Sequence, residues 1–261
     1  MTVSDILEMV ISSEKKAGEM LLHAHGIIAE NKTDARNVVT EYDRKVQDLL
    51  VADFSRELPG AHFFCEENDR QESLNVEHSF IIDPIDGTSN FVYGFRHSCV
   101  SVAYANFGEV LAAAVYNPYS GELFRAEKGK GAFLNDNPIH VSEAGLSESI
   151  VCFGTAPYYH EIEEETLSAA RFLYENALDF RREGSAELDL CSVASGRAGF
   201  FVELMLSYWD FAAGALIVEE AGGKCLTADG KPLPADGSKS SVIAGTARAV
   251  EDYLAGTRKP Q

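Results

Sequence analysis

Apolar residues recur at helical spacing over the first part of the chain. From residue 4 to residue 24 they return every three or four positions, which predicts an amphipathic helix. The same spacing predicts a second helix over residues 41–58, and Pro59 and Gly60 end it. The polar stretch 31–37 between the two helices is typical of a hairpin or a loop.

Short apolar runs separated by turn signals follow the second helix. They predict strands, and from residue 98 onward an antiparallel meander, because turn residues at 118–121 and 135–138 punctuate closely spaced runs. The predicted strands of this half cover residues 62–64, 79–82, 98–105, 110–116, 123–126 and 131–134.

Beyond residue 149 the pattern changes to strands that alternate with helices, which is typical of an α/β layer. The small, polar segment 142–149 is the candidate junction. We therefore expect two halves, residues 1–145 and 146–261, fused into one catalytic unit with its site in the cleft between them. The predicted elements of the second half are strands at 150–153, 179–182, 199–204 and 241–244 and helices at 163–175, 185–195 and 209–221.

Composition limits the class of protein. The chain has 261 residues, 46% of them hydrophobic, which is enough for one large core or two fused halves. Its formal charge of -19 argues against nucleic acid or an anionic membrane as the main partner. Five scattered cysteines without zinc spacing, no signal-peptide pattern and no membrane-length apolar run predict a cytoplasmic protein.

Two carboxylates, Asp83 and Asp86, follow directly on the predicted strand 79–82 and precede Gly87-Thr88. Acids at a strand end beside the free N–H groups of a helix start suit Mg²⁺ together with a phosphate ester. A plain alternative is an aspartate-rich turn whose acids cap the next helix.

Two further acids, Glu66 and Asp210, stand at comparable positions. Either one alone is compatible with a simple cap, but four converging carboxylates repel one another and need a cation. Two Mg²⁺ ions would cancel the charge and could hold the attacking and leaving oxygens of a phosphoryl group. The carbonyl oxygen of Ile85 is a further candidate ligand.

Gly87 has no Cβ, so a phosphate can approach the backbone N–H groups of Gly87 and Thr88. Thr88 also offers a hydroxyl, which Asp43 would have to activate. From the sequence pattern alone Asp43 is better explained as an exposed helix residue. The chain contains no P-loop pattern.

Two motifs resemble the signatures of the inositol monophosphatase family, Mg²⁺-dependent and lithium-sensitive phosphatases of sugars and polyols. They are Asp83-Pro84-Ile85-Asp86-Gly87-Thr88 and Trp209-Asp210-Phe211-Ala212-Ala213-Gly214. The similarity runs from the first helix to residue 243 and includes segments 39–43, 66–67, 128–133 and 219–223. It implies a layered αβαβα sandwich, with an antiparallel N-terminal half and a mixed C-terminal half, and usually a homodimer.

The resemblance also assigns roles to residues. It implies two or three Mg²⁺ ions per site, with Mn²⁺ as a possible substitute, and a phosphorylated polyol or sugar as the partner. The implied metal ligands are Glu66, Asp83, the Ile85 carbonyl, Asp86 and Asp210. The implied catalytic residues are Thr88, Asp43 and Glu66, and the phosphate-binding pair is Gly87 and Thr88. The implied substrate-binding residues are Asp86, Gly184, Ser185, Ala186 and Glu203, and Lys32 matches a loop lysine near a third, weak metal site.

The chain departs from the family pattern at Cys65, where glycine is usual. A cysteine here either shifts the strand end and weakens the first metal site or is tolerated as a small residue; a reactive thiol is disfavoured, since nothing nearby in sequence lowers its pKa. Segment 154–159 falls where family members differ, so we expect it to influence substrate choice.

The resulting hypothesis is hydrolysis of inositol-1-phosphate by direct attack of a metal-activated water. Fructose-1,6-bisphosphatase and histidinol-phosphate phosphatase activities are the alternatives on the same scaffold, and a 3′-phosphoadenosine nucleotidase is disfavoured because the chain is compact. A non-catalytic partner of the transcription machinery is an alternative from another class, but such a protein is expected to have lost a metal ligand, and here all four acids remain.

Overall fold

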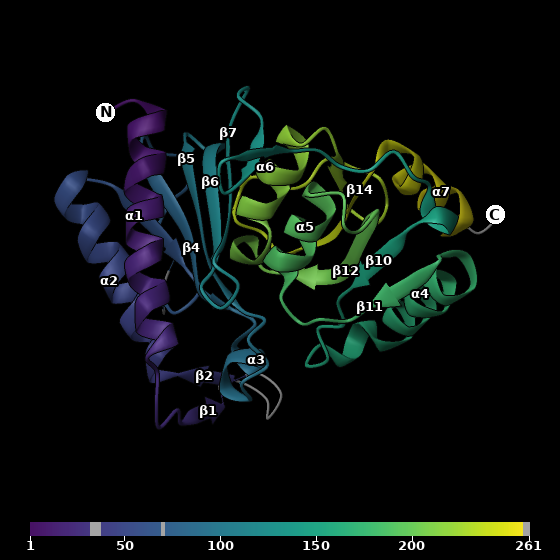
Figure 1. The fold of residues 1–261 in the computed structure, drawn as a ribbon, viewed down its shortest axis with the longest axis horizontal. Coiled ribbons are helices and arrows are strands. Elements are labelled where there is room, and N and C mark those ends of the chain that lie inside the picture. Colours follow the sequence, from purple (N-terminus) through teal and green to yellow (C-terminus); the bar gives the residue numbers. More distant parts are fainter. Residues whose placement is uncertain (32–37, 69–70, 258–261) are drawn as a thin grey trace.

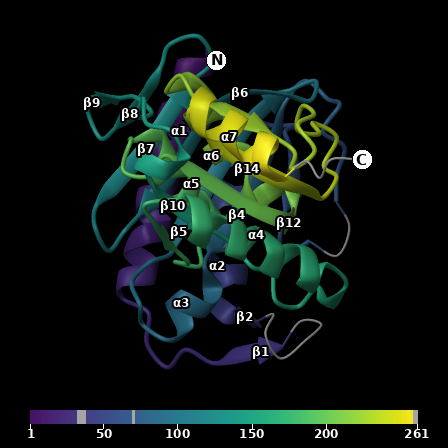
Figure 2. The ribbon, with the colours of Figure 1, turned by 90° about the vertical axis from the view of Figure 1, so that its right-hand side faces the viewer.

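Two β-sheets alternate with three layers of helices in this protein. The structure is a computed structural model that describes residues 1–31, 38–68 and 71–257. Figure 1 shows α1 and α2 outside the first sheet, α5 and α6 between the sheets, and α4 and α7 outside the second sheet. Figure 2, turned by 90°, shows α7 and α4 lying across the outer face of the second sheet. The predicted αβαβα sandwich is confirmed.

The first sheet has seven strands in chain order, β3 to β9. All neighbours pair antiparallel except β3 and β4, which are parallel because the chain crosses back between them. The predicted meander is therefore correct from β4 onward. The strands are β3 (His62–Cys65), β4 (Ser79–Asp86), β5 (Cys99–Asn106), β6 (Glu109–Asn117), β7 (Glu122–Glu127), β8 (Ala132–Leu134) and β9 (Asn137–Ile139).

The second sheet is mixed, as predicted, with the strand order β11-β10-β12-β14-β13. Strand β10 runs parallel to both neighbours, whereas β14 runs antiparallel to β12 and β13. The strands are β10 (Ile150–Phe153), β11 (Asp179–Arg181), β12 (Phe200–Leu206), β13 (Lys224–Leu226) and β14 (Ser240–Gly245).

The helices agree with the sequence pattern within two or three residues, apart from one that it did not predict. A small pair of antiparallel strands, β1 (Ala29–Asn31) and β2 (Val38–Thr40), lies between the first two helices in the sequence. The helices are α1 (Val3–Leu22), α2 (Glu41–Glu57), α3 (Thr88–Val92), α4 (Glu163–Asn176), α5 (Ala186–Ala194), α6 (Ala212–Glu220) and α7 (Ala247–Thr257).

Alternation along the strands explains the layers, because successive side chains of a strand point to opposite faces. On β4, Phe80 and Ile82 pack under α1 and α2, whereas Ile81 packs toward α5 and α6. On β12, Phe201 joins this middle core, and Phe200 packs toward α4 and α7. Helices α5 and α6 are consequently buried on both sides; α6 is apolar up to Val218, whereas α5 also buries two acids, Glu187 and Asp189.

Three elements were not predicted: β9, β13 and α7. Strand β9 lies where turn residues 135–138 were expected, and β13 and α7 lie on either side of the predicted strand 241–244. The division of the chain at residue 145 stays a prediction. None of the helices among the described residues combines the length and apolar character needed to cross a membrane.

One ionisable group lies inside the outer core. Glu14 on α1 is 0% exposed, and neither carboxylate oxygen has a well-formed hydrogen bond among the described residues. Burial and the nearby Glu187 raise the pKa of Glu14 well above its usual value, against a smaller lowering by the backbone of Val102. The folded chain therefore holds a proton at Glu14 that the unfolded chain releases as pH rises.

We expect Glu14→Met to raise the free energy of unfolding by about 1–3 kcal/mol at pH 8, since an apolar side chain of similar length replaces a buried acid. The gain should shrink toward about pH 5, where the unfolded chain also begins to hold the proton. Urea unfolding at both pH values measures it. Glu8→Met, on the exposed side of α1, is the control; an equal gain there, or a gain independent of pH, would contradict the prediction.

Candidate active site

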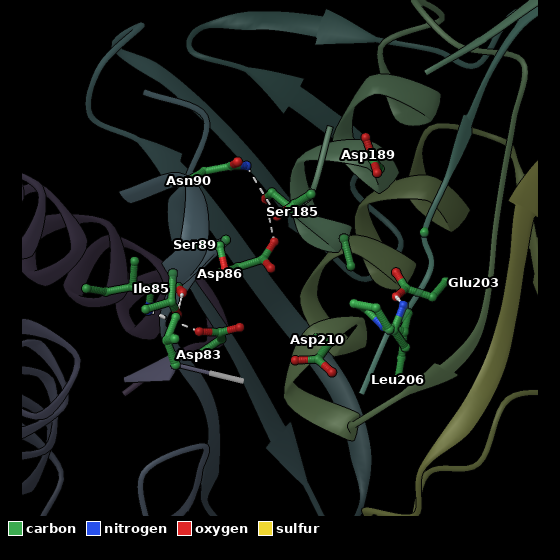
Figure 3. Close-up of a pocket in the computed structure, with 18 of the residues that line it drawn as sticks. Asp83, Ile85, Asp86, Ser89, Asn90, Ser185, Asp189, Glu203, Leu206 and Asp210 are labelled. Carbon is green, nitrogen blue, oxygen red and sulfur yellow. Dashed lines mark hydrogen bonds between the residues drawn. The ribbon is translucent and has the colours of Figure 1, made fainter. Parts of the chain in front are cut away.

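A cleft between the two sheets gathers the predicted site residues. It encloses ≈ 180 Å³ and is lined by the ends of β4 and β12, the starts of α3 and α5 and the segment after β10. Figure 3 shows Asp83 and Asp86 on one wall and Asp210 and Glu203 on the other. Glu66, the remaining acid of the predicted metal-binding set, also lines the cleft. Acids that are distant in sequence thus converge as predicted.

A β-bulge in β4 decides where the two aspartates of the first motif point. Side chains three positions apart on a regular strand lie on opposite faces. Asp83 pairs with Ser101 and Asp86 pairs with Cys99, so β4 has one residue more than β5 over this step. The extra residue brings both carboxylates to the cleft, whereas Ile85 packs in the core beneath α1 and α2.

The start of α5 fixes the carboxylate of Asp86. The Ser185 hydroxyl donates to Asp86 Oδ2 at 2.5 Å, and the Glu187 backbone N–H donates to the same oxygen at 2.8 Å. The side chain of Glu187 in turn accepts a hydrogen bond of 2.6 Å from the backbone N–H of Gly214 in α6. Glu187 therefore connects Asp86 with the helix that follows Asp210.

Glu187 was missed by the sequence analysis. The available signal was a pair of acids, Glu187 and Asp189, in the largely apolar run 186–194, because a buried helix tolerates an acid only with partners. Asn90 was missed for another reason, since its partners are backbone atoms: its side-chain amide donates to the carbonyls of His97, Glu183 and Gly184.

Asp210 lies in a short 3₁₀ turn, Tyr208–Asp210, and does not open the following helix. The expectation of one helix over 209–221 is wrong at its start, because α6 begins at Ala212. The carboxylate caps its own turn by accepting from the Ser207 backbone N–H at 2.6 Å. The capping alternative and the cleft position therefore both hold for this residue.

The acids of the cleft perturb one another. Burial raises the pKa of Asp83 well above its usual value, and the charges of Glu66, Asp86 and Asp210 raise it further. Burial and Glu66 raise the pKa of Asp210 in the same way, whereas hydrogen bonds from Ser185 and Glu187 partly oppose the rise at Asp86. Several buried carboxylates with hard oxygen donors are the environment that a divalent cation neutralises. The donor set therefore fits Mg²⁺.

The predicted pairing of Thr88 with Asp43 is present in the structure. The Thr88 hydroxyl lies 3.2 Å from Asp43 Oδ1 and 3.1 Å from the carbonyl oxygen of Ile85. Asp43 is 0% exposed, so the expectation of an exposed helix residue is wrong. Its other oxygen accepts from the backbone and hydroxyl of Thr40, which closes the capping box of α2.

Gly87 occupies a position where a side chain larger than hydrogen would clash with the backbone. It has a positive φ of 84°, and a Cβ there would lie 3.0 Å from the His97 carbonyl and 3.1 Å from that of Gly184. Because α3 has only five residues, the N–H groups of Gly87 and Thr88, and not a long helix dipole, would face a phosphate.

Glu203 lies on the wall opposite Gly87. Its Oε1 accepts from the Ala156 backbone N–H at 3.1 Å, and a Cβ on Gly154 would overlap its carboxylate at 1.8 Å. Burial raises the pKa of Glu203 to about 7, and Asp86 adds to the rise. Four residues of segment 154–159 line the same cleft, together with Gly184, Ser185 and Ala186.

Cys65 ends β3 without disturbing it. The side chain is 0% exposed, and burial raises the pKa of its thiol to about 12, so it is neutral at pH 7. Gln71 holds the backbone at this position through hydrogen bonds with both the N–H and the carbonyl of Cys65. The residue behaves as a tolerated small side chain. Lys32 lies outside the described residues.

Comparisons with known proteins agree with the motifs. The model of the inositol monophosphatase family matches residues 2–260. An inositol-1-monophosphatase of Rhizobium meliloti (strain 1021) is 35% identical over 97% of this chain and 97% of its own length. A putative Nus factor SuhB of Neisseria meningitidis serogroup B is 35% identical over 85% of this chain and 86% of its own.

A solved structure of the extragenic suppressor protein suhB from Bartonella henselae has a TM-score of 0.90 and 31% identity, covering 98% of this chain and 100% of that one. The sequence match, the shared fold and the converging motif residues agree along almost the entire chain. The chain therefore belongs to the inositol monophosphatase family of metal-dependent phosphatases.

Proposed function

We propose that this protein hydrolyses a phosphate monoester of a small polyol in a Mg²⁺-dependent reaction, with inositol-1-phosphate as the first candidate substrate. The observation that carries the proposal is the set of four acids, two of them buried, that line one cleft together with Gly87 and Thr88. The relative from Rhizobium meliloti, named an inositol-1-monophosphatase, supports the choice of substrate.

Glu66, Asp83, Asp86 and Asp210, with the Ile85 carbonyl, would hold the magnesium. Bound there, Mg²⁺ would supply a Lewis acid that draws charge from the phosphoryl oxygens and lowers the pKa of a water molecule. The chain itself fixes the ligands beforehand, through the bulge in β4 and the hydrogen bonds to Asp86 and Asp210.

Thr88 and Asp43 would orient the attacking water and take up its proton. The single proton of the Thr88 hydroxyl is shared between Asp43 Oδ1 and the Ile85 carbonyl, so the oxygen of this hydroxyl can accept from a water. Asp43 is held by two hydrogen bonds from Thr40 and cannot swing away without breaking the cap of α2. The series of hydrogen bonds from the water to Thr88 and on to Asp43 would place a proton acceptor two hydrogen bonds away from the water.

The walls of the cleft favour a small, hydroxyl-rich substrate. Its volume of ≈ 180 Å³ is below the roughly 300–1,000 Å³ of common ligand pockets, which disfavours a nucleotide. Glu203 and Ser185 offer polar groups to ring hydroxyls, next to the backbone of Gly184 and Ala186. Fructose-1,6-bisphosphate and histidinol phosphate remain the alternative substrates.

A second role as a protein partner is suggested by the Neisseria relative named a putative Nus factor. Because every predicted metal ligand is kept here, such binding would accompany catalysis. A pull-down and a phosphate-release assay on one preparation separate the two roles. The homodimer, the cytoplasmic location and the lithium sensitivity stay predictions.

We expect Asp83→Asn to lower kcat/KM by at least about 10³-fold, because a ligand of the metal is lost. Without metal the variant should melt at a higher temperature than the wild type at pH 7, since the fold no longer has to bury or protonate a carboxylate whose pKa burial and the neighbouring acids raise. Phosphate release and thermal unfolding with and without Mg²⁺ measure both effects. Asp48→Asn on the exposed face of α2 is the control, and a wild-type rate in the Asp83 variant would rule the assignment out.

Thr88→Ala should reduce kcat about 10²–10³-fold with little change in KM, because the proton acceptor loses its link to the water. Thr88→Ser keeps the hydroxyl and should restore most of the rate. Steady-state kinetics at saturating Mg²⁺ distinguish the two variants. Equal losses in both would show that the methyl group, and not the hydroxyl, matters.

Glu203→Gln should raise KM for inositol-1-phosphate about tenfold above pH 7 and leave KM for p-nitrophenyl phosphate, which has no ring hydroxyls, unchanged. The raised pKa of about 7 means that Glu203 is neutral below this pH and a stronger, charged acceptor above it. The wild-type KM should therefore fall as pH rises through about 7, and the variant KM should not. The same assay run with fructose-1,6-bisphosphate and histidinol phosphate identifies the preferred substrate; parallel pH profiles in both proteins would exclude the role of Glu203.

A further inference from the structure

A second group of metal-binding side chains lies beside the cleft. His97, Glu183 and Asp189 each offer a donor atom, and these three atoms all lie within 4.8 Å of one another. In the part of the chain that the structure describes, no other three His, Cys, Asp or Glu side chains are grouped in this way. His97 precedes β5, Glu183 precedes α5 and Asp189 lies within α5. Only the folded chain brings them together.

Asp189 is the buried member of this group. It is 2% exposed, and its Oδ1 makes no hydrogen bond within the described residues. Figure 3 shows it on α5, beyond Ser185. Burial raises its pKa well above the usual value, and the thiol of Cys152 is the main group that opposes this rise. A carboxylate so deeply buried is stable as an anion only beside a cation or several donors.

His97 and Glu183 complete the group from the solvent side. His97 Nε2 lies 3.3 Å from Glu183 Oε2, yet this nitrogen makes no well-formed hydrogen bond among the described residues. The two side chains are 29% and 41% exposed, and both line a cavity of ≈ 420 Å³ through which an ion can enter.

Two of the positive side chains beside this cavity already have acidic partners elsewhere, although Arg181 also feels the charge of Glu183. Three arginines line it: Arg96, Arg181 and Arg197. Arg181 is paired with Asp179 at 2.6 Å and Arg197 with Glu122 at 2.5 Å. Both of these guanidinium groups already have an acidic partner outside the group of three.

We propose that His97, Glu183 and Asp189 form a binding site for one transition-metal dication of the Zn²⁺ and Co²⁺ type. One imidazole nitrogen and two carboxylate oxygens are a ligand set that suits zinc, whereas magnesium prefers oxygen ligands alone. Ligands of zinc lie at ~2.0–2.2 Å from the ion. The donor atoms therefore need only a small inward movement, which the partly exposed side chains of His97 and Glu183 permit.

An ion bound at this site would fix the backbone that surrounds Gly87 and Thr88, the proposed phosphate-binding residues. The side chain of Asn90 already joins the carbonyls of His97 and Glu183, at 2.8 and 2.7 Å. The carbonyls of His97 and Gly184 are the atoms that a Cβ on Gly87 would meet. An ion held by the side chains of His97 and Glu183 would tie the same two segments a second time, and Asp189, which also lines the cleft, would anchor it to α5. The ion would therefore have a structural role at the phosphate-binding residues.

The test is a titration of the full-length protein with Co²⁺ in saturating Mg²⁺, which keeps the cleft acids occupied. We expect one additional site per chain, a visible absorption band typical of four- or five-coordinate Co²⁺, and a rise in melting temperature. Co²⁺ should also broaden the imidazole NMR signals of His97 in the wild-type protein, a readout that needs no variant. No band, or broadening at other histidines only, overturns the proposal.

Matched variants separate this site from the others. His97→Ala should lose the band and at least tenfold in affinity for Co²⁺. His62→Ala should keep both, because His62 lies 3.0 Å from Glu72 in a comparable pair that lacks a third ligand. Asp83→Asn should also keep the band. If Asp83→Asn abolishes it, the ion sits in the cleft and the proposal fails, whether or not the proposed phosphatase activity holds.

Discussion

The crowding of buried carboxylates in one cleft is the constraint on which the rest of this structure depends. Asp83 and Asp86 are 2% and 8% exposed, and their charges and that of Asp210 raise one another's pKa values. An uncompensated buried charge costs several kcal/mol, against a total stability of about 5–15 kcal/mol for a domain. The fold therefore supplies hydrogen bonds to these carboxylates. A metal ion, on which this family of phosphatases depends, would neutralise their charge.

Elements with a structural purpose also carry the site. Asp43 closes the capping box of α2 with one oxygen and holds Thr88 with the other. Ser185 caps α5 and donates to Asp86. Asp210 caps its own turn and still lines the cleft. These residues are therefore both caps and candidate site residues, because one oxygen of a carboxylate can cap a turn while the other contacts a second group.

The sequence was sufficient for the layers, and less so for the details that orient the side chains. Periodic apolar runs predicted α1, α2 and the strands β3 to β8 of the first sheet, since burial of one face fixes their period. The bulge in β4 was not predictable, because it depends on the partner residues of β5. Strand β13 has only three residues, so its local pattern was too weak to identify it. Helix α7 has eleven residues with Ala249, Val250 and Tyr253 on its buried face, so its signal was present in the sequence and was overlooked. Glu187 was hidden for the same reason that it matters: its partners, Asp86 and Gly214, are distant in sequence.

The packing of α5 and α6 beside the candidate metal ligands explains why the arrangement of these side chains can exist before any ion arrives. Helices α5 and α6 pack on both sheets, so a shift that separated Asp86 from Ser185 would disturb the cores on two sides. Close packing resists such shifts, because interiors have few voids to absorb them. The electrostatic cost is thus retained in the metal-free chain, and a cation bound in the cleft would relieve it. Catalysis by fixed dipoles and charges requires this preorganisation, and a site built between two sheets supplies it more firmly than a surface loop would.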